Sequence, residues 1–74
     1  MNVYPNPSEN EIKIEFKTAS VYEISILDFT GKLIYRKQIN DDGCVIQKSD
    51  LNTGIYFLKI TNNNKTFIQK IVFY

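Results

Sequence analysis

The chain contains no histidine and only one cysteine, Cys44, and both shortages limit the chemistry available to it. Without histidine, neither a Ser-His-Asp triad nor a Cys-His dyad can be assembled. A single cysteine cannot form an internal disulfide bond, and a zinc site would need ligands beyond it and the scattered carboxylates. We interpret Cys44 as a small, semi-buried hydrophobic residue and not as a reactive thiol. These shortages predict a protein that is not an enzyme.

Long apolar runs and blocks of a single charge sign are lacking as well. No segment approaches the ~20 apolar residues of a membrane-spanning helix, so we expect no membrane insertion. Nine Lys and Arg against eight Asp and Glu leave a formal net charge of +1. Because these charges form no basic stripe, nucleic acid and anionic membranes are not expected partners. There is no glycine-rich phosphate loop, and we expect no cofactor.

The chain has 74 residues, of which 43% are hydrophobic, and this is typical of one small folded domain. We therefore expect a single domain over residues 1–74. A core of this size yields only ~3–5 kcal/mol of net stability, and a deep catalytic cleft is hard to build from it. The sequence opens directly on Met1-Asn2-Val3 without a signal peptide. We interpret it as a piece excised from a larger protein, with Met1 as an added start codon.

Apolar and charged side chains alternate along the chain, which is the pattern of strands with one buried face. Ile12, Ile14 and Phe16 alternate with charged residues and predict a strand over residues 11–17. A similar alternation, broken by a turn over residues 28–32 that contains Gly31, predicts a hairpin over residues 21–39. Further strands are expected over residues 44–48, 55–61 and 66–74. Turns are expected over residues 40–43, 49–54 and 62–65.

No stretch of ten residues has the 3.6-residue period of a helix, and the β-branched and aromatic content opposes one. Six or seven short strands, with turns every eight to twelve residues, predict an all-β antiparallel sandwich. The segment 55–61 carries apolar residues on both faces, so we expect it to be a central strand.

Carboxylates are the remaining groups from which a catalytic or metal site could be built. Oxygen ligands for calcium could come from Asp41, Asp42 and Asp50, but their spacing matches no calcium loop, and turn aspartates usually cap their own backbone. A pair for glycoside hydrolysis could come from Glu11, Glu15 and Glu23, but these fall on strand faces opposite the core. Asn64-Lys65-Thr66 fits the N-glycosylation pattern, which is common by chance. We therefore expect no metal and no catalytic residue.

Three stretches together carry a resemblance to a known family. The first is Val3-Tyr4-Pro5-Asn6-Pro7, followed by the strand at 11–17. The second is the hairpin containing Ile24-Ser25-Ile26-Leu27-Asp28 and Gly31-Lys32. The third is the segment 51–60, Leu-Asn-Thr-Gly-Ile-Tyr-Phe-Leu-Lys-Ile, with Lys70-Ile71-Val72 near the end. This ordered set spans essentially the whole chain and closely resembles the C-terminal sorting domain of the type IX (Por) secretion system, type A. Asn52 departs from the Pro or small residue that members often carry before the glycine, but Gly54 remains.

The resemblance implies an Ig-like antiparallel β-sandwich of about seven short strands, following a larger N-terminal cargo domain. Such a domain is a secretion signal and not a catalyst. It is recognised by the outer-membrane translocon of a Gram-negative bacterium and is commonly removed afterwards by a sortase-like protease, which can join the cargo to lipopolysaccharide. The protein is then expected in the periplasm in transit, and afterwards at the cell surface or outside the cell.

Several residues are candidates for recognition by these partners. Tyr4, Pro5 and Pro7 would form a stiff lead-in between cargo and domain, or else a rigid edge turn without a partner. Gly54 is expected in a conformation that costs a residue with a Cβ ~1–2 kcal/mol. We interpret Tyr56 as a core aromatic residue whose hydroxyl bonds locally, in preference to a direct partner contact.

The last strand, 66–74, is apolar on both faces except at Lys70. A terminal strand often lies at a sheet edge, where its free backbone groups can accept another strand. We therefore predict that the translocon reads residues 66–74, with Lys70 giving orientation and Ile71 and Val72 the apolar contact. An ordinary core strand is the alternative.

Two other functions remain open. The domain could be an accessory carbohydrate-binding or adhesion module, but such modules usually display exposed aromatic residues. This chain lacks Trp, and most of its Tyr and Phe are expected in the core. It could also be a structural cap for an upstream domain. Exposed strand edges would also permit a weak homodimer.

Overall fold

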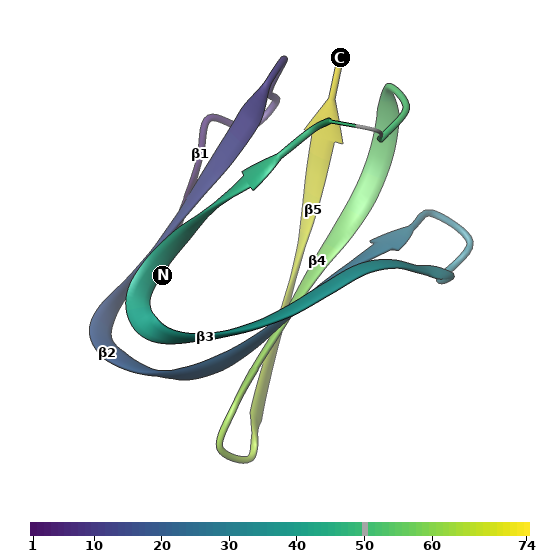
Figure 1. Ribbon diagram of the computed structural model, residues 1–74. Helices are drawn as coiled ribbons and strands as arrows, with labels where there is room; N and C mark the ends of the chain where they lie inside the picture. Colours follow the sequence, from purple (N-terminus) through teal and green to yellow (C-terminus); the bar gives the residue numbers. More distant parts are fainter. Residues whose placement is uncertain (50) are drawn as a thin grey trace.

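The alternating pattern of the sequence becomes one strongly curled antiparallel sheet (Figure 1). The computed structural model describes residues 1–49 and 51–74, and in these residues the chain is all-β without a helix, as predicted. The strands in this part of the chain are β1 (Asn2–Tyr4), β2 (Glu11–Asp28), β3 (Leu33–Gln47), β4 (Gly54–Asn62) and β5 (Lys65–Phe73).

The long strand β2 organises the sheet because it pairs with three other strands. Its first part lies between β1 and the end of β3, and these three segments form what we term the N-terminal arm. Its second part lies between the start of β3 and β4, and β4 pairs in turn with β5. We term this second group the C-terminal arm. The segment 55–61 is therefore central in its arm, as predicted.

A bulge in β2 folds the β2–β3 hairpin back on itself. Glu15 pairs with Gly43, and the next paired residues are Ser20 and Asp41, so four residues of β2 stand opposite the single residue Asp42. Unequal lengths of this kind bend the longer strand. The two arms consequently face each other across the curl (Figure 1).

This continuity corrects the strand count of about seven. The segment predicted at 11–17 and the first strand of the hairpin predicted at 21–39 are one strand, β2. The second strand of that hairpin and the segment predicted at 44–48 are likewise one strand, β3, which leaves five strands in the described residues. The arms face each other as sandwich layers do, but they are joined through β2 and β3. The Ig-like arrangement itself stays a prediction.

The turn predicted over residues 40–43 was wrong, because these residues lie inside β3. An added Cβ at Gly43 would stand 2.6 Å from the carbonyl oxygen of Ile14, which is a main-chain atom. Gly43 is therefore suited to a close approach of β3 to β2 at the bend. Sequence patterns do not distinguish that role of glycine from a turn.

The core lies between the arms and receives side chains from both. The alternation is clearest in β2, where Ile12 and Ile14 are buried next to the exposed Lys13 and Glu15. The eleven buried apolar residues among those described are Ile12, Ile14, Tyr22, Ile24, Ile26, Ile46, Tyr56, Leu58, Ile60, Ile71 and Phe73.

The two predicted hairpin turns at 28–32 and 62–65 are confirmed. In the first, the Asp28 carboxylate accepts hydrogen bonds from the Thr30 hydroxyl and from the amides of Thr30 and Lys32. These bonds, with that from the Thr30 hydroxyl foremost, hold the pKa of Asp28 below its usual value. In the second, Asn63 adopts a φ of 55°, which asparagine tolerates well.

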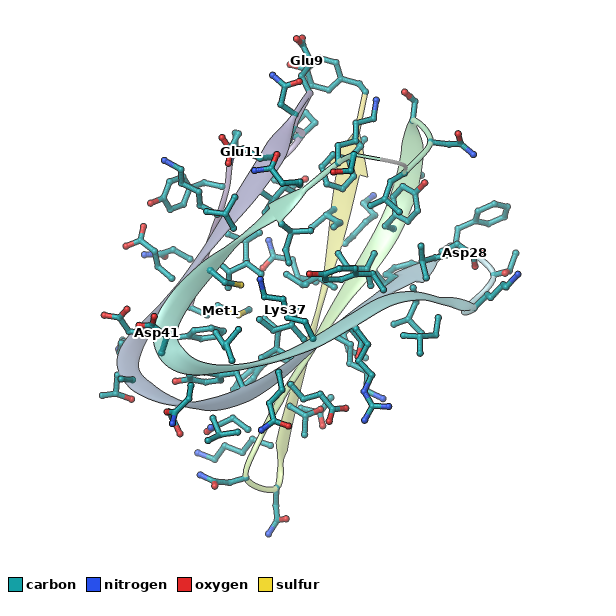
Figure 2. All side chains as sticks on the ribbon, viewed as in Figure 1. Met1, Glu9, Glu11, Asp28, Lys37 and Asp41 are labelled. Atoms are coloured by element: carbon teal, nitrogen blue, oxygen red, sulfur yellow. The ribbon has the colours of Figure 1, made fainter. Side chains whose placement is uncertain are left out.

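The edge formed by β3 is protected by a charge. Lys37 pairs with the buried Ile24 and points between the two arms (Figure 2). An inward-pointing charge discourages an incoming strand from lying flat along an edge. Of the strand edges on which a homodimer could form, this one is therefore poorly suited.

Candidate recognition surface

The outer edge of β5 is closed by a segment from the other end of the chain. The Asn6 side-chain amide donates to the carbonyl oxygen of Lys70 at 3.0 Å and accepts from the amide of Val72 at 3.1 Å. The Ser8 amide donates to the Val72 carbonyl at 2.8 Å, and the Tyr74 amide donates to the Ser8 carbonyl at 2.9 Å. Asn6 and Ser8 thus occupy the backbone groups that a further strand would use.

The open edge predicted for the last strand is therefore absent over residues 70–74. Sequence reasoning missed the roles of Asn6 and Ser8 because their partners lie more than sixty positions away, at separations of 64 and 66 residues for Asn6. The only available signal was Asn6 itself, placed between two prolines. Its side chain imitates a peptide group, since a side-chain amide also carries an N–H donor next to a carbonyl acceptor.

The proline segment lies inside the fold and not ahead of it, which corrects the predicted lead-in. Tyr4 already belongs to β1 and pairs with Lys13 of β2. The exposed Pro5 and Pro7 follow it, both after cis peptide bonds, in the connection that crosses from β1 to the edge of β5. The Tyr4 hydroxyl donates to the Glu15 carboxylate, and this hydrogen bond raises the pKa of Tyr4.

Gly54 and Tyr56 hold the start of β4 in place. Gly54 has a φ of 157°, and no atom lies within 4 Å of its virtual Cβ, so a larger residue would be strained by its backbone alone. The Tyr56 hydroxyl donates to the Asn52 carbonyl at 2.7 Å, and its ring packs edge-on against Phe73. The local role predicted for the Tyr56 hydroxyl is confirmed.

Lys70, Ile71 and Val72 were predicted to contact the translocon, but their side chains do not all face the same way. Ile71 is fully buried in the core, whereas Lys70 is exposed and Val72 is partly exposed. Alternation along β5 places Lys70 and Val72 together on the outward face. In the folded domain only these two of the three side chains are positioned to meet a partner.

The expectation that most aromatic side chains lie in the core was wrong. Of the ten Tyr and Phe residues, three are buried, two are partly buried and five are exposed. The exposed ones are Tyr4, Phe29, Tyr35, Phe67 and Tyr74. They come from β1, the β2–β3 turn, β3, β5 and the end of the chain. The two ring pairs in the described residues, Phe16–Tyr22 and Tyr56–Phe73, include none of these exposed rings.

The carboxylates and the thiol do not assemble into a site in the described residues. No group of three His, Cys, Asp or Glu there could hold a metal ion, and Asp50 lies outside them. Glu11, Asp28 and Asp41 stand at separate places on the molecule (Figure 2). Burial raises the pKa of the half-buried Cys44 thiol, which opposes reactivity.

Residues 1–49 and 51–74 contain no helix with the length and apolar character needed to cross a membrane.

Comparison with known proteins gives the chain its family. Two relatives are each 28% identical to it over 74 residues: an endo-acting ulvan lyase of Formosa agariphila and the ulvan lyase NLR42 of Nonlabens ulvanivorans. Both matches cover 97% of this chain but only 14% of the relative. The family described as the secretion system C-terminal sorting domain matches residues 2–74. The chain therefore belongs to the C-terminal sorting domains of the type IX secretion system, a family of secretion signals and not of catalysts.

Proposed function

We propose that this domain directs a cargo protein through the type IX secretion system across the outer membrane, where the translocon recognises it. The observation that carries the proposal is the family match over residues 2–74. The lengths of the relatives support it, because the chain spans only 14% of each of them. A module of this relative size is consistent with a secretion signal attached to a much larger protein.

Removal by a sortase-like protease is part of the same proposal. Since Asn2–Tyr4 already form β1 and pair with β2, the cut would fall before this strand, at the junction with an N-terminal cargo domain. A cut at that place leaves the sheet whole. The released cargo would then remain at the cell surface or leave the cell.

Export of a reporter tests the proposal. Residues 2–74 are fused to the C-terminal end of a periplasmic reporter protein in a host that has the type IX system. The reporter is expected at the cell surface or in the medium, and is expected to stay in the periplasm when the domain is omitted or the translocon gene is deleted. Retention of the complete fusion inside the cell, with the domain folded, would refute the proposal.

Carbohydrate binding or adhesion is the second candidate, and the five exposed aromatic side chains favour it. A sugar-binding platform needs several rings on one surface. The exposed rings here come from five separate places along the chain, which weakens this candidate. Isothermal titration against a panel of polysaccharides separates the two functions, since specific binding that leaves export unchanged would favour the second.

A further inference from the structure

The C-terminal arm has a second apolar face, which points away from the core. In β4 the buried Tyr56, Leu58 and Ile60 alternate with the outward-facing Phe57 and Lys59. The alternation in β2 and β5, and the pairing of the start of β3 with β2, place further apolar side chains on the same side of the sheet. We term this set the outer patch, and it consists of Leu27, Leu33, Ile55, Phe57, Ile68 and Val72.

Strand register makes the outer patch continuous. Leu33 pairs with Leu27, Leu27 with Phe57, and Phe57 with Lys70, so that one row of side chains crosses four strands. Ile55 pairs with Val72 in the adjoining row. Paired side chains on one face lie ~5 Å apart, so the members of the patch are neighbours. A contiguous apolar surface of this kind marks an interaction site more often than scattered residues do.

Solvent exposure distinguishes the outer patch from a second core. The exposed fraction is 65% for Ile68, 49% for Leu33 and 45% for Ile55. Apolar side chains with such large exposed fractions are not part of the packed core and contribute little to the stability of the fold. Changes at Ile68 in particular should leave the stability of the domain nearly unaltered.

The charged residues that pair directly with members of the outer patch are both lysines. Lys59 and Lys70 are both exposed, and Lys59 pairs with Ile68 while Lys70 pairs with Phe57. Glu23, two residues before the partner of Lys59 in β2, lies on the same face, but its carboxylate forms an ion pair with Arg36 at 3.0 Å. In the described part of the chain, neither lysine has an ion-pair partner. A complementary surface would therefore present apolar groups together with carboxylates.

We propose that the outer patch, with Lys59 and Lys70, docks onto an apolar protein surface bearing carboxylates on the secretion machinery; this inference rests on the proposed function. A face-on contact fits the structure because the edge of β5 is closed by Asn6 and Ser8 at residues 70–74. A protein is favoured over an anionic membrane, which typically attracts clusters of about 4–8 basic residues, far more than this face offers.

A matched pair of double variants tests the inference in the reporter fusion. Lys59→Glu with Ile68→Ser changes a cross-strand lysine–aliphatic pair in the outer patch. Lys13→Glu with Val45→Ser changes the corresponding kind of pair on the N-terminal arm, where both side chains are also exposed. The first variant is expected to lower the amount of exported reporter about tenfold, because reversed charge and lost apolar contact both weaken docking. The second is expected to export normally.

The export results distinguish failure of the docking surface from failure of the proposed function. Normal export by both double variants, or equal loss in both, would overturn the docking surface while leaving the proposed function intact. Failure of the unaltered domain to export the reporter would instead refute the proposed function, and this inference with it. Circular dichroism melts establish that the variants fold, and Lys59→Glu alone serves if the double variant does not. Binding of the isolated domain to phosphatidylglycerol vesicles, lost in the first variant, would assign the patch to a membrane and overturn the protein partner.

Discussion

At the scale of single residues, two tyrosines have the same local function in different places. The Tyr22 hydroxyl donates to the carbonyl of Thr18 at 2.8 Å, as the Tyr56 hydroxyl does to Asn52, so each bonds to a carbonyl four residues earlier. Tyr22 also stacks on Phe16, with ring centroids 3.7 Å apart. Each tyrosine thus fixes irregular backbone, at the β2 bulge and before β4. The sequence predicted this role for Tyr56 but not for Tyr22, because nothing in the alternating pattern revealed the bulge.

Gly43 offers a direct test of the bend. Gly43→Ala is expected to lower the free energy of unfolding by about 1–3 kcal/mol, because the new methyl group would press against the Ile14 carbonyl oxygen and one of the strands would have to move. Urea denaturation followed by circular dichroism measures the change. The neighbouring Asp42→Ala is the control, since the Asp42 side chain is exposed and its loss should cost less than about 0.5 kcal/mol. Equal stability of the two variants would contradict the close approach.

At the scale of elements, the strands and hairpins were largely predictable and their connections were not. Alternation located the strand segments because burial on one face imposes a period of two. The signal Asp41-Asp42-Gly43 was misread, since the same residues favour a tight turn and permit a bulged bend. Closure of the β5 edge was not predictable, because Asn6 between its two prolines does not indicate partners that lie 64 and 66 residues away, at Lys70 and Val72.

Asn6→Ala tests whether that closure stabilises β5. The change removes two hydrogen bonds to β5 main-chain groups, and the unfolding free energy should fall by about 1 kcal/mol because water replaces them. Hydrogen exchange of the Val72 amide should accelerate, since this amide loses its acceptor and the strand end opens more often. Nuclear magnetic resonance reads the rate for this single amide. Asn10→Ala, in the same connection, should leave it unchanged, and an unaltered Val72 rate in Asn6→Ala would show that the side chain does not hold the edge.

At the scale of the whole molecule, the two arms depend on each other. The radius of gyration is 11.5 Å, close to the ~11 Å expected of a compact chain of this length. The arms share β2 and β3, and the core residues of each are shielded by the other. The sequence predicted an all-β domain of this size. It did not predict the curl, because the curl depends on a long-range fit between the two halves of the β2–β3 hairpin. A core divided between the arms also leaves the outward face of β4 and β5 free for a partner.

Unfolding should therefore be a single transition. Ile12→Val in the N-terminal arm and Ile60→Val in the C-terminal arm each remove one buried methylene group, which costs about 0.5–1.5 kcal/mol, because both side chains are at most 1% exposed. If the arms form one unit, either substitution lowers the urea midpoint equally for amide signals from both arms. Ile68→Val makes the same chemical change on the exposed face and should leave the midpoint nearly unaltered. Separate midpoints for the two arms would mean that each arm folds alone, and that the bend at β2 is a hinge between independent units.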